Sequence, residues 1–409
     1  MGRKQEKVRF WIPAGILVLL FFLARQMPLY EPAPEDPFTG TYWYNPYGNV
    51  TPGGQWLRSN FHAHSNSWKF ITNGKDNTVG DIVTTYDSLG YDIIGVSDYQ
   101  HITDTRTVVP ATGTEATKNR LFIPVYEHGF NVCKTHQGTI GARMVYWNDY
   151  VLPQTRSQKQ HILEQLGERS ELVVLHHPAW MGGYSKKDVR RLSGYDLFEV
   201  LNDFWISEEL WDVALSSGKP AMLIAGDDAH NIFKPTDLAR DLTMIHAGAQ
   251  DPLAPEDVYR ALKTGAAYGI EVTRSVARGS VVQKRACLDA LPVLQSCRIQ
   301  GDSLVVVLSG KARQFHFIGQ DGALLKSVPA GADMAADEAG SAHTPDNAAG
   351  VADSAFYLLQ EQDRYVRVKI ALPDSSHIYL NPVMRTMEKN KKPPMPPVRK
   401  RRLFTIFDT

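Results

Sequence analysis

Two short segments of the sequence each carry a pair of potential metal ligands at alternating positions. His62 and His64 follow one apolar run, and Asp228 and His230 follow another. In extended backbone, side chains repeat on one face every second residue, so both members of a pair are expected to point the same way. Two such pairs on different strands of one sheet could converge on a cation cluster. Imidazole with carboxylate is a ligand mix that suits zinc, manganese or iron in a hydrolytic site.

The elements that must position these pairs alternate along the chain from residue 55 to residue 275. Apolar runs typical of strands span 57–62, 91–98, 121–127, 171–177, 195–202, 221–227 and 242–246. Helical segments span 78–89, 158–169, 186–192, 208–216 and 255–263. Continuous apolar strands alternating with helices predict a parallel sheet covered on both faces, or a barrel.

Polar residues recur at the carboxyl ends of these predicted strands. They are His62, Asp98, Glu127, His177, Asn202 and Asp228. In a β/α barrel, the active site is built at that end of the strands. A structural protein has no reason to place ligand-type groups there repeatedly, so the pattern favours catalysis.

The ordered set of motifs resembles the PHP family, which is named for polymerase and histidinol phosphatase domains. The motifs are His62-Ala63-His64, Val96-Ser97-Asp98, Tyr126-Glu127-His128, Thr135-His136, His176-His177-Pro178, Glu199-Val200 and Asp227-Asp228-Ala229-His230. The resemblance covers residues 56–274 and implies a distorted (β/α)7 barrel. It also implies two or three divalent metal ions and the hydrolysis of phosphoesters.

Carried over by position, the resemblance implies seven metal ligands, with Glu127 in the bridging place. They are His62, His64, Glu127, His136, His177, Asp228 and His230. Where the family has a histidine after the second-motif aspartate, this chain has Tyr99, and His101 follows two residues later. This departure leaves the number of metal ions open. Of the neighbours His176 and His177, strand alternation predicts that only one faces the centre, and the position before Pro178 favours His177.

Such a centre would use metal-activated water. A bound cation lowers the pKa of water from 15.7 to about 7. Asp98 or His101 is expected to act as the catalytic group that moves a proton to the leaving group. Candidates for binding an anionic substrate are Arg106, Arg120, Arg143 and Arg240.

Several functions remain open for this site. The first expectation is a phosphoesterase acting on a small molecule, and the second is a carboxyl or carbamate ester hydrolase with the same metal ions. A third is a non-catalytic, membrane-tethered binding protein that has lost one metal site. A nucleic-acid partner is not expected, because lysine plus arginine and aspartate plus glutamate balance at 44 each.

The amino terminus has the layout of a secretory signal or a signal anchor. Residues 10–24 are almost wholly apolar and follow Arg3, Lys4, Lys7 and Arg9. No convincing cleavage site follows, so an uncleaved membrane anchor is favoured over a cleaved signal. The catalytic domain would then lie outside the cytoplasm, periplasmic or extracellular, or be secreted.

The composition and residue pattern divide the chain into further parts. After the signal or anchor (1–30), a tether (31–54) rich in Pro, Tyr and Gly leads to the PHP-like barrel (55–275). Short strand-like runs then predict a small antiparallel β domain (276–385), followed by a basic, disordered tail (386–409). Cys287 and Cys297 could pair in an oxidising compartment.

Overall fold

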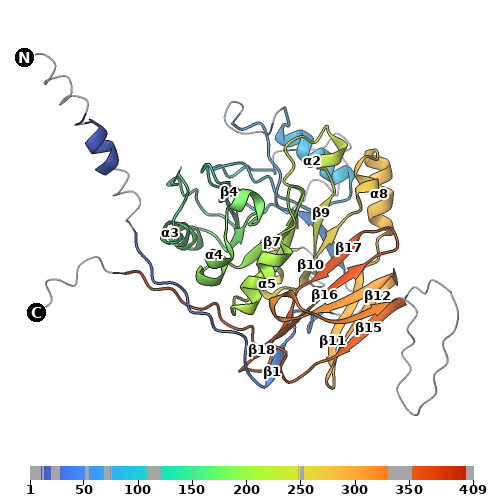
Figure 1. Cartoon of the computed structure of the whole chain (residues 1–409). Coiled ribbons are helices and arrows are strands. Elements are labelled where there is room, and N and C mark those ends of the chain that lie inside the picture. Colours follow the sequence, from blue (N-terminus) through green and yellow to red (C-terminus); the bar gives the residue numbers. More distant parts are fainter. Residues whose placement is uncertain are drawn as a thin grey trace, which may run out of the picture.

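The computed structural model describes most of the chain, as three β-sheets with helices packed around them (Figure 1). The described residues are 11, 13–19, 28–50, 55–68, 74, 76–106, 108, 121–150, 152–246, 248, 253–329 and 352–401.

A five-stranded sheet lies on one side of the candidate site. Its order is β4 (Val125–His128), β5 (Gln137–Ile140), β6 (Leu172–Leu175), β7 (Leu197–Asn202) and β8 (Met222–Gly226). The β6, β7 and β8 strands are parallel, whereas β5 is antiparallel to both neighbours. Every residue of the three parallel strands is buried, as their continuous apolar sequences predict.

A ten-stranded sheet lies on the other side and joins distant parts of the chain. Its main order is β1 (Tyr42–Tyr44), β18 (Val383–Thr386), β16 (Tyr365–Ala371), β17 (His377–Leu380), β10 (Ala267–Glu271), β9 (Asp241–His246), β2 (Trp56–Asn60) and β3 (Ile93–Ile94). From β16 branch β13 (Gln314–Ile318) and then β14 (Leu324–Pro329). A separate three-stranded antiparallel sheet consists of β11 (Leu294–Gln300), β12 (Ser303–Ala312) and β15 (Ala352–Leu358).

The expected (β/α)7 barrel is wrong, because the described strands form separate sheets and no closed barrel. The β4 and β5 strands form an antiparallel pair joined by a short loop, and β9 and β10 are antiparallel to each other. A parallel barrel needs all its strands to run in the same direction, and these two antiparallel pairs break that order. Strands do form after residue 275, as the sequence predicts. However, β13, β16, β17 and β18 join the ten-stranded sheet.

The predicted helices are confirmed: α2 (Val79–Ser88), α3 (Arg156–Gly167), α4 (Lys186–Arg191), α5 (Glu208–Ser216) and α6 (Pro255–Thr264). Three of them begin at capping boxes, in which Thr78, Thr155 and Ser185 each accept from the backbone three residues later. Two further helices, α7 (Arg274–Ala277) and α8 (Val281–Ala290), follow the last strand of the site region.

The expected membrane anchor, and the localisation that depended on it, are not supported. Within the described part of the chain, no helix has the length and apolar character needed to cross a membrane. Residues 10, 12 and 20–24 of the apolar segment lie outside the described residues, as do residues 1–9 and 25–27.

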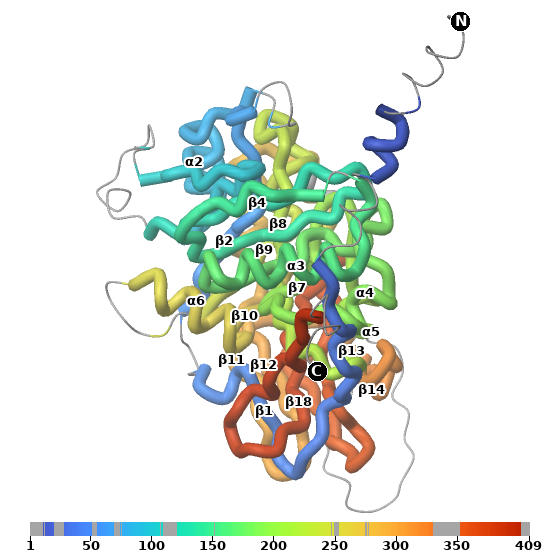
Figure 2. The backbone as a smooth tube through the Cα atoms, turned by 90° about the vertical axis from the view of Figure 1, so that its left-hand side faces the viewer, coloured from blue at the N-terminus to red at the C-terminus, as the bar shows by residue number. Residues whose placement is uncertain are grey.

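The two segments expected to be a tether and a disordered tail lie side by side over their described parts. The β1 strand pairs with β18, and farther out Glu31 donates to the carbonyl of Arg399 at 2.8 Å. Figure 2 shows the amino-terminal and carboxyl-terminal tubes running together past this edge of the molecule. Cys287 and Cys297, which could have formed a disulfide, are both free.

Candidate metal centre

The two alternating ligand pairs lie opposite each other across one β-bridge. Ala63 pairs with Ala229 in parallel, and the His64 amide donates to the Ala229 carbonyl at 2.9 Å. This register places His62 and His64 against Asp228 and His230. The bridge between Ala63 and Ala229 therefore brings the pairs together, although Asp228 has a left-handed φ of 49° and not the extended backbone that the sequence predicts.

The first group of potential ligands consists of His62, His64, Glu127 and Asp228, all buried. The Nε2 atoms of His62 and His64 both lie 3.1 Å from Asp228 Oδ1. They lie 3.5 and 3.2 Å, respectively, from Glu127 Oε2. Four nitrogen and oxygen donors therefore face one point.

The second group uses the other oxygen of the same glutamate. Glu127 Oε1 lies 2.8 Å from His136 Nδ1 and 3.2 Å from His177 Nε2. Glu127 sits in β4, where a parallel bridge to Tyr99 and the pairing with β5 fix its backbone. One carboxylate thus faces two separate sets of imidazoles.

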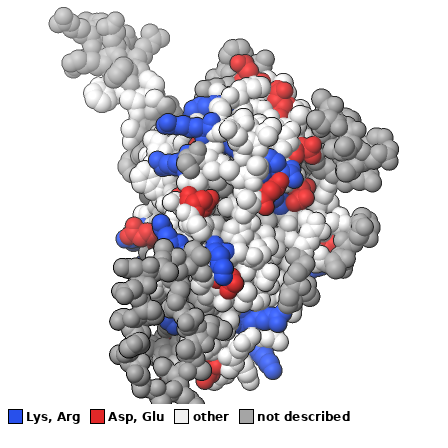
Figure 3. Space-filling model, turned by 90° about the vertical axis from the view of Figure 1, so that its right-hand side faces the viewer, with Lys and Arg blue, Asp and Glu red and all other residues white. Residues whose placement is uncertain are grey.

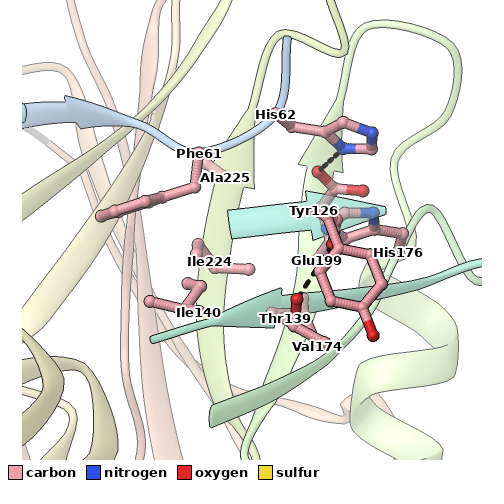
Figure 4. A pocket seen from close by; sticks show the side chains of 10 residues that line it. All are labelled: Phe61, His62, Tyr126, Thr139, Ile140, Val174, His176, Glu199, Ile224 and Ala225. Carbon is pink, nitrogen blue, oxygen red and sulfur yellow. Dashed lines mark hydrogen bonds and ion pairs between the residues drawn. The ribbon is translucent and has the colours of Figure 1, made fainter. Parts of the chain in front are cut away.

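A third group consists of His62, His176 and Glu199, which line a small internal cavity (Figure 4). The expectation that only one of His176 and His177 faces the centre is wrong. The β6 strand ends at Leu175, and His177 has a φ of 27°, so strand alternation no longer applies to this pair. The His176 ring stacks on His62 with centroids 3.9 Å apart, and its Nδ1 lies 3.2 Å from Glu127 Oε1.

Glu199, like His176, belongs to this centre but is absent from the ligand set that the resemblance implied. Its Oε1 lies 2.7 Å from His62 Nδ1, and its Oε2 accepts from the His177 amide at 2.7 Å. Figure 4 shows the first of these interactions as a dashed line between the two side chains. The Glu199-Val200 motif in the middle of a buried strand was the available signal. Only the fold shows that this carboxylate points at two ligands.

The charges of the centre are strongly coupled. Burial alone would lower the pKa of His64, but hydrogen bonds to Asp228 and Glu127 raise it to about 9. Burial likewise opposes the raised pKa of His62, where the charges of Asp228, Glu199 and Glu127 outweigh it. Burial would raise the pKa values of Glu127 and Asp228, yet the imidazoles around them hold both values well below the ordinary range. The centre therefore favours anionic carboxylates facing positive charge.

Several inward-facing atoms of the centre fit a divalent cation. His62 Nε2 and Glu127 Oε2 are fully buried and have no hydrogen-bond partner. His62 Nδ1 lies at hydrogen-bond distance from Glu199, and His230 Nδ1 lies 2.7 Å from the Asp228 carbonyl oxygen. If each Nδ1–H donates to its neighbouring oxygen, the Glu199 carboxylate or the Asp228 carbonyl, each Nε2 keeps its lone pair for a metal ion. The donor set thus suits metal binding.

The two residues expected to be catalytic lie apart from these three ligand groups. Asp98 accepts from the Ser65 amide at 2.6 Å and from the hydroxyls of Ser65, Ser67 and Thr103 at 2.7, 2.8 and 2.5 Å. Its carboxylate is therefore occupied in holding the loop that follows His64. His101 is exposed to solvent.

The arginines considered for substrate binding are engaged elsewhere. Arg106 pairs with Asp104, Arg143 with Glu171, and Arg240 with Asp203. Arg120 lies outside the described residues. The family's histidine position is filled by Tyr99, whose ring stacks on His64 with centroids 4.6 Å apart.

Comparisons with known proteins add no relative: no family model, no curated protein and no solved structure matches the chain. The three buried ligand groups are therefore the observation from which a function must be argued.

Proposed function

We propose that this protein is a metal-dependent hydrolase that cleaves phosphoesters at a centre of two divalent cations. The observation that carries this proposal is the position of Glu127. Its Oε2 faces His62, His64 and Asp228, and its Oε1 faces His136 and His177. A carboxylate shared in this way suits a paired site, with His176 and Glu199 beside it.

The chain's own residues hold and orient this centre. Glu199 fixes the ring of His62 and, through the amide of His177, the backbone of a second ligand. Asp228 has a left-handed φ of 49°, which lets its carboxylate and the His230 ring approach from one turn. Burial is the largest influence lowering the pKa of His230, so this imidazole is neutral near pH 7 and its Nε2 lone pair is available to a metal ion.

When bound, a pair of zinc, manganese or iron ions would polarise a phosphoryl oxygen and lower the pKa of a water molecule. The order of the ligand motifs, which resembles the PHP family, also supports phosphoester hydrolysis. Charged side chains of both signs are intermixed on the face shown in Figure 3, which fits a small substrate better than a polyanion.

A substrate panel with the metal-loaded chain tests the proposal. Nitrophenyl phosphate, a nitrophenyl phosphodiester and a nitrophenyl carboxyl ester are compared with Mn²⁺ or Zn²⁺. Phosphoester cleavage that Glu127→Gln abolishes, and that Glu171→Gln leaves unchanged, is the expected result. Glu171 is a matched control because it pairs with Arg143, outside the three ligand groups.

Two results would reject the phosphoesterase. Cleavage of the carboxyl ester without phosphoester cleavage would assign the same centre to ester hydrolysis. No turnover with any metal would leave a binding protein.

A further inference from the structure

The most exposed member of the expected ligand set marks the way into the centre. The His230 side chain is 15% exposed, whereas the other six are at most 2% exposed. His230 is therefore the member of this set nearest to solvent, and a substrate is expected to approach the buried groups beside it.

A wall of aromatic rings stands at this entrance. Phe204 contacts His230 with ring centroids 5.8 Å apart, edge to face. Trp180 stacks on Phe204 at 5.1 Å with the two planes 22° apart, and it meets the His177 ring at 5.0 Å. The two rings thus connect the side chains of His230 and His177, two members of the expected ligand set.

The wall is held in place yet open to solvent. Trp180 lies in the turn after β6, and Phe204 follows β7, so two neighbouring strands fix both positions. Phe204 is 43% exposed, and Trp180 is partly exposed. Large apolar rings are usually withdrawn from water, so exposed flat rings beside a polar centre are typical of a binding surface.

The chemistry around the wall fits an anion that carries a ring. Lys134 Nζ lies over the Trp180 ring, 5.8 Å from its centroid, so a positive charge is held close to the two rings. The three buried ligand groups would receive the phosphoryl oxygens. Phe204, the more exposed of the two rings, offers an offset-stacking surface for a planar group attached to that phosphoryl, and Trp180 supports it from the other side.

We propose that Trp180 and Phe204 select substrates whose esterified group is a planar aromatic ring, an inference that rests on the proposed phosphoesterase. One stacking contact of this kind is worth about 0.5–1.5 kcal/mol, or about a threefold to tenfold preference.

Non-hydrolysable phosphonates test this preference without the influence of the leaving group. The affinity of the Mn²⁺-loaded full chain is measured by calorimetry for phenylphosphonate, cyclohexylphosphonate, octylphosphonate and inorganic phosphate. Phenylphosphonate is expected to bind about threefold to tenfold more tightly than cyclohexylphosphonate. In Trp180→Leu and Phe204→Leu this ratio should fall toward one. Because the readout is a ratio within each variant, partial metal loading cannot produce the change.

Phe356→Leu is the matched control, since Phe356 is also an exposed phenylalanine (38%) but lies in β15 of the three-stranded sheet. Its ratio should equal that of the unaltered chain. Equal affinity for the phenyl and cyclohexyl compounds, or tighter binding of the octyl compound, would overturn the aromatic preference. If inorganic phosphate still binds in that case, the proposed function survives. If neither phosphate nor any phosphonate binds, both proposals fail.

Discussion

Two glutamates of the centre, Glu127 and Glu199, are expected to have different roles. Glu127 faces both ligand groups, whereas Glu199 contacts the Nδ1 of His62, the ring atom opposite the one that points to the first group. A carboxylate behind a histidine ligand fixes its tautomer and raises its basicity. The first glutamate is therefore expected to decide whether two cations bind, and the second how tightly they bind.

Glu199→Gln is expected to weaken metal binding by about 10–100-fold without unfolding the chain. The amide can still contact His62 but no longer carries the negative charge. Competition with a chromogenic chelator measures the affinity, and Glu171→Gln serves again as the control. An unchanged affinity would remove Glu199 from the centre.

Metal binding is expected to release protons and to strengthen as the pH rises. In the metal-free chain, the carboxylates keep His62 and His64 protonated, and the pKa of His64 is raised to about 9. A metal ion needs the neutral imidazole, so it must displace these protons. Calorimetry in two buffers with different ionisation enthalpies measures the release. No difference between the buffers would contradict these raised pKa values.

The same pKa values determine how the stability of the metal-free fold depends on pH. Because the pKa of His64 is higher in the folded chain than its ordinary value of 6.5, its contribution to stability is fully present below about pH 6.5. That contribution is lost as the pH rises through about 9. We expect the free energy of unfolding to fall by about 1–3 kcal/mol over this range. Denaturant titrations of the metal-free chain check the sign, and a constant free energy would contradict it.

At the scale of elements, the connection between β8 and β9 depends on one buried carboxylate beside a ligand. Asp227 accepts from the amides of Ala239, Arg240 and Asp241 at 2.7, 2.7 and 3.0 Å, and from the Tyr86 hydroxyl at 2.7 Å. This clamp joins the loop before β9 and the α2 helix to the turn that carries Asp228.

Asp227→Asn is expected to destabilise the fold by about 2–3 kcal/mol, because an amide group would face donors that now share a carboxylate. Tyr86→Phe removes one donor and should cost only about 1 kcal/mol. Denaturant unfolding of both variants gives the comparison. Equal and small losses would show that the clamp is not needed.

The sequence predicted elements well where the apolar pattern was continuous and helix caps were present. Within the predicted barrel region it missed β5 and β10, because Gln137–Ile140 places glycine and polar residues in buried positions and Ala267–Glu271 has a glycine at its centre. The alternation of His62 with His64 was sufficient to predict a shared direction. The convergence of His176 and Glu199 was not predictable, since it depends on a positive φ and on which strands become neighbours.

At the scale of the whole molecule, a buried ion pair joins the late strands to the site-bearing half. Arg367 in β16 donates from Nε and Nη2 to Asp212 of α5 at 2.7 and 2.6 Å, and its Nη1 lies 2.9 Å from Glu208. The sequence suggested a break near residue 275, and it could not show that strands beyond this point complete a sheet containing β2 and β9. Pairing between strands so far apart leaves no local pattern.

Arg367→Ala is expected to destabilise the fold by about 3–5 kcal/mol, because two carboxylates lose their buried partner. Replacing the pair together, as Arg367→Met with Asp212→Leu, should recover much of this loss. Thermal and denaturant unfolding measure both variants. A loss below about 1 kcal/mol in Arg367→Ala would place the pair among weak surface interactions.

The most direct test of the central claim is the metal content of the purified chain after loading with Mn²⁺ or Zn²⁺ and desalting, compared with that of Glu127→Ala. If Glu127 joins two cation sites, the unaltered chain should retain two metal ions and the variant one or none. Retention of the same number of ions by both proteins, or of none by the unaltered chain, would contradict the account.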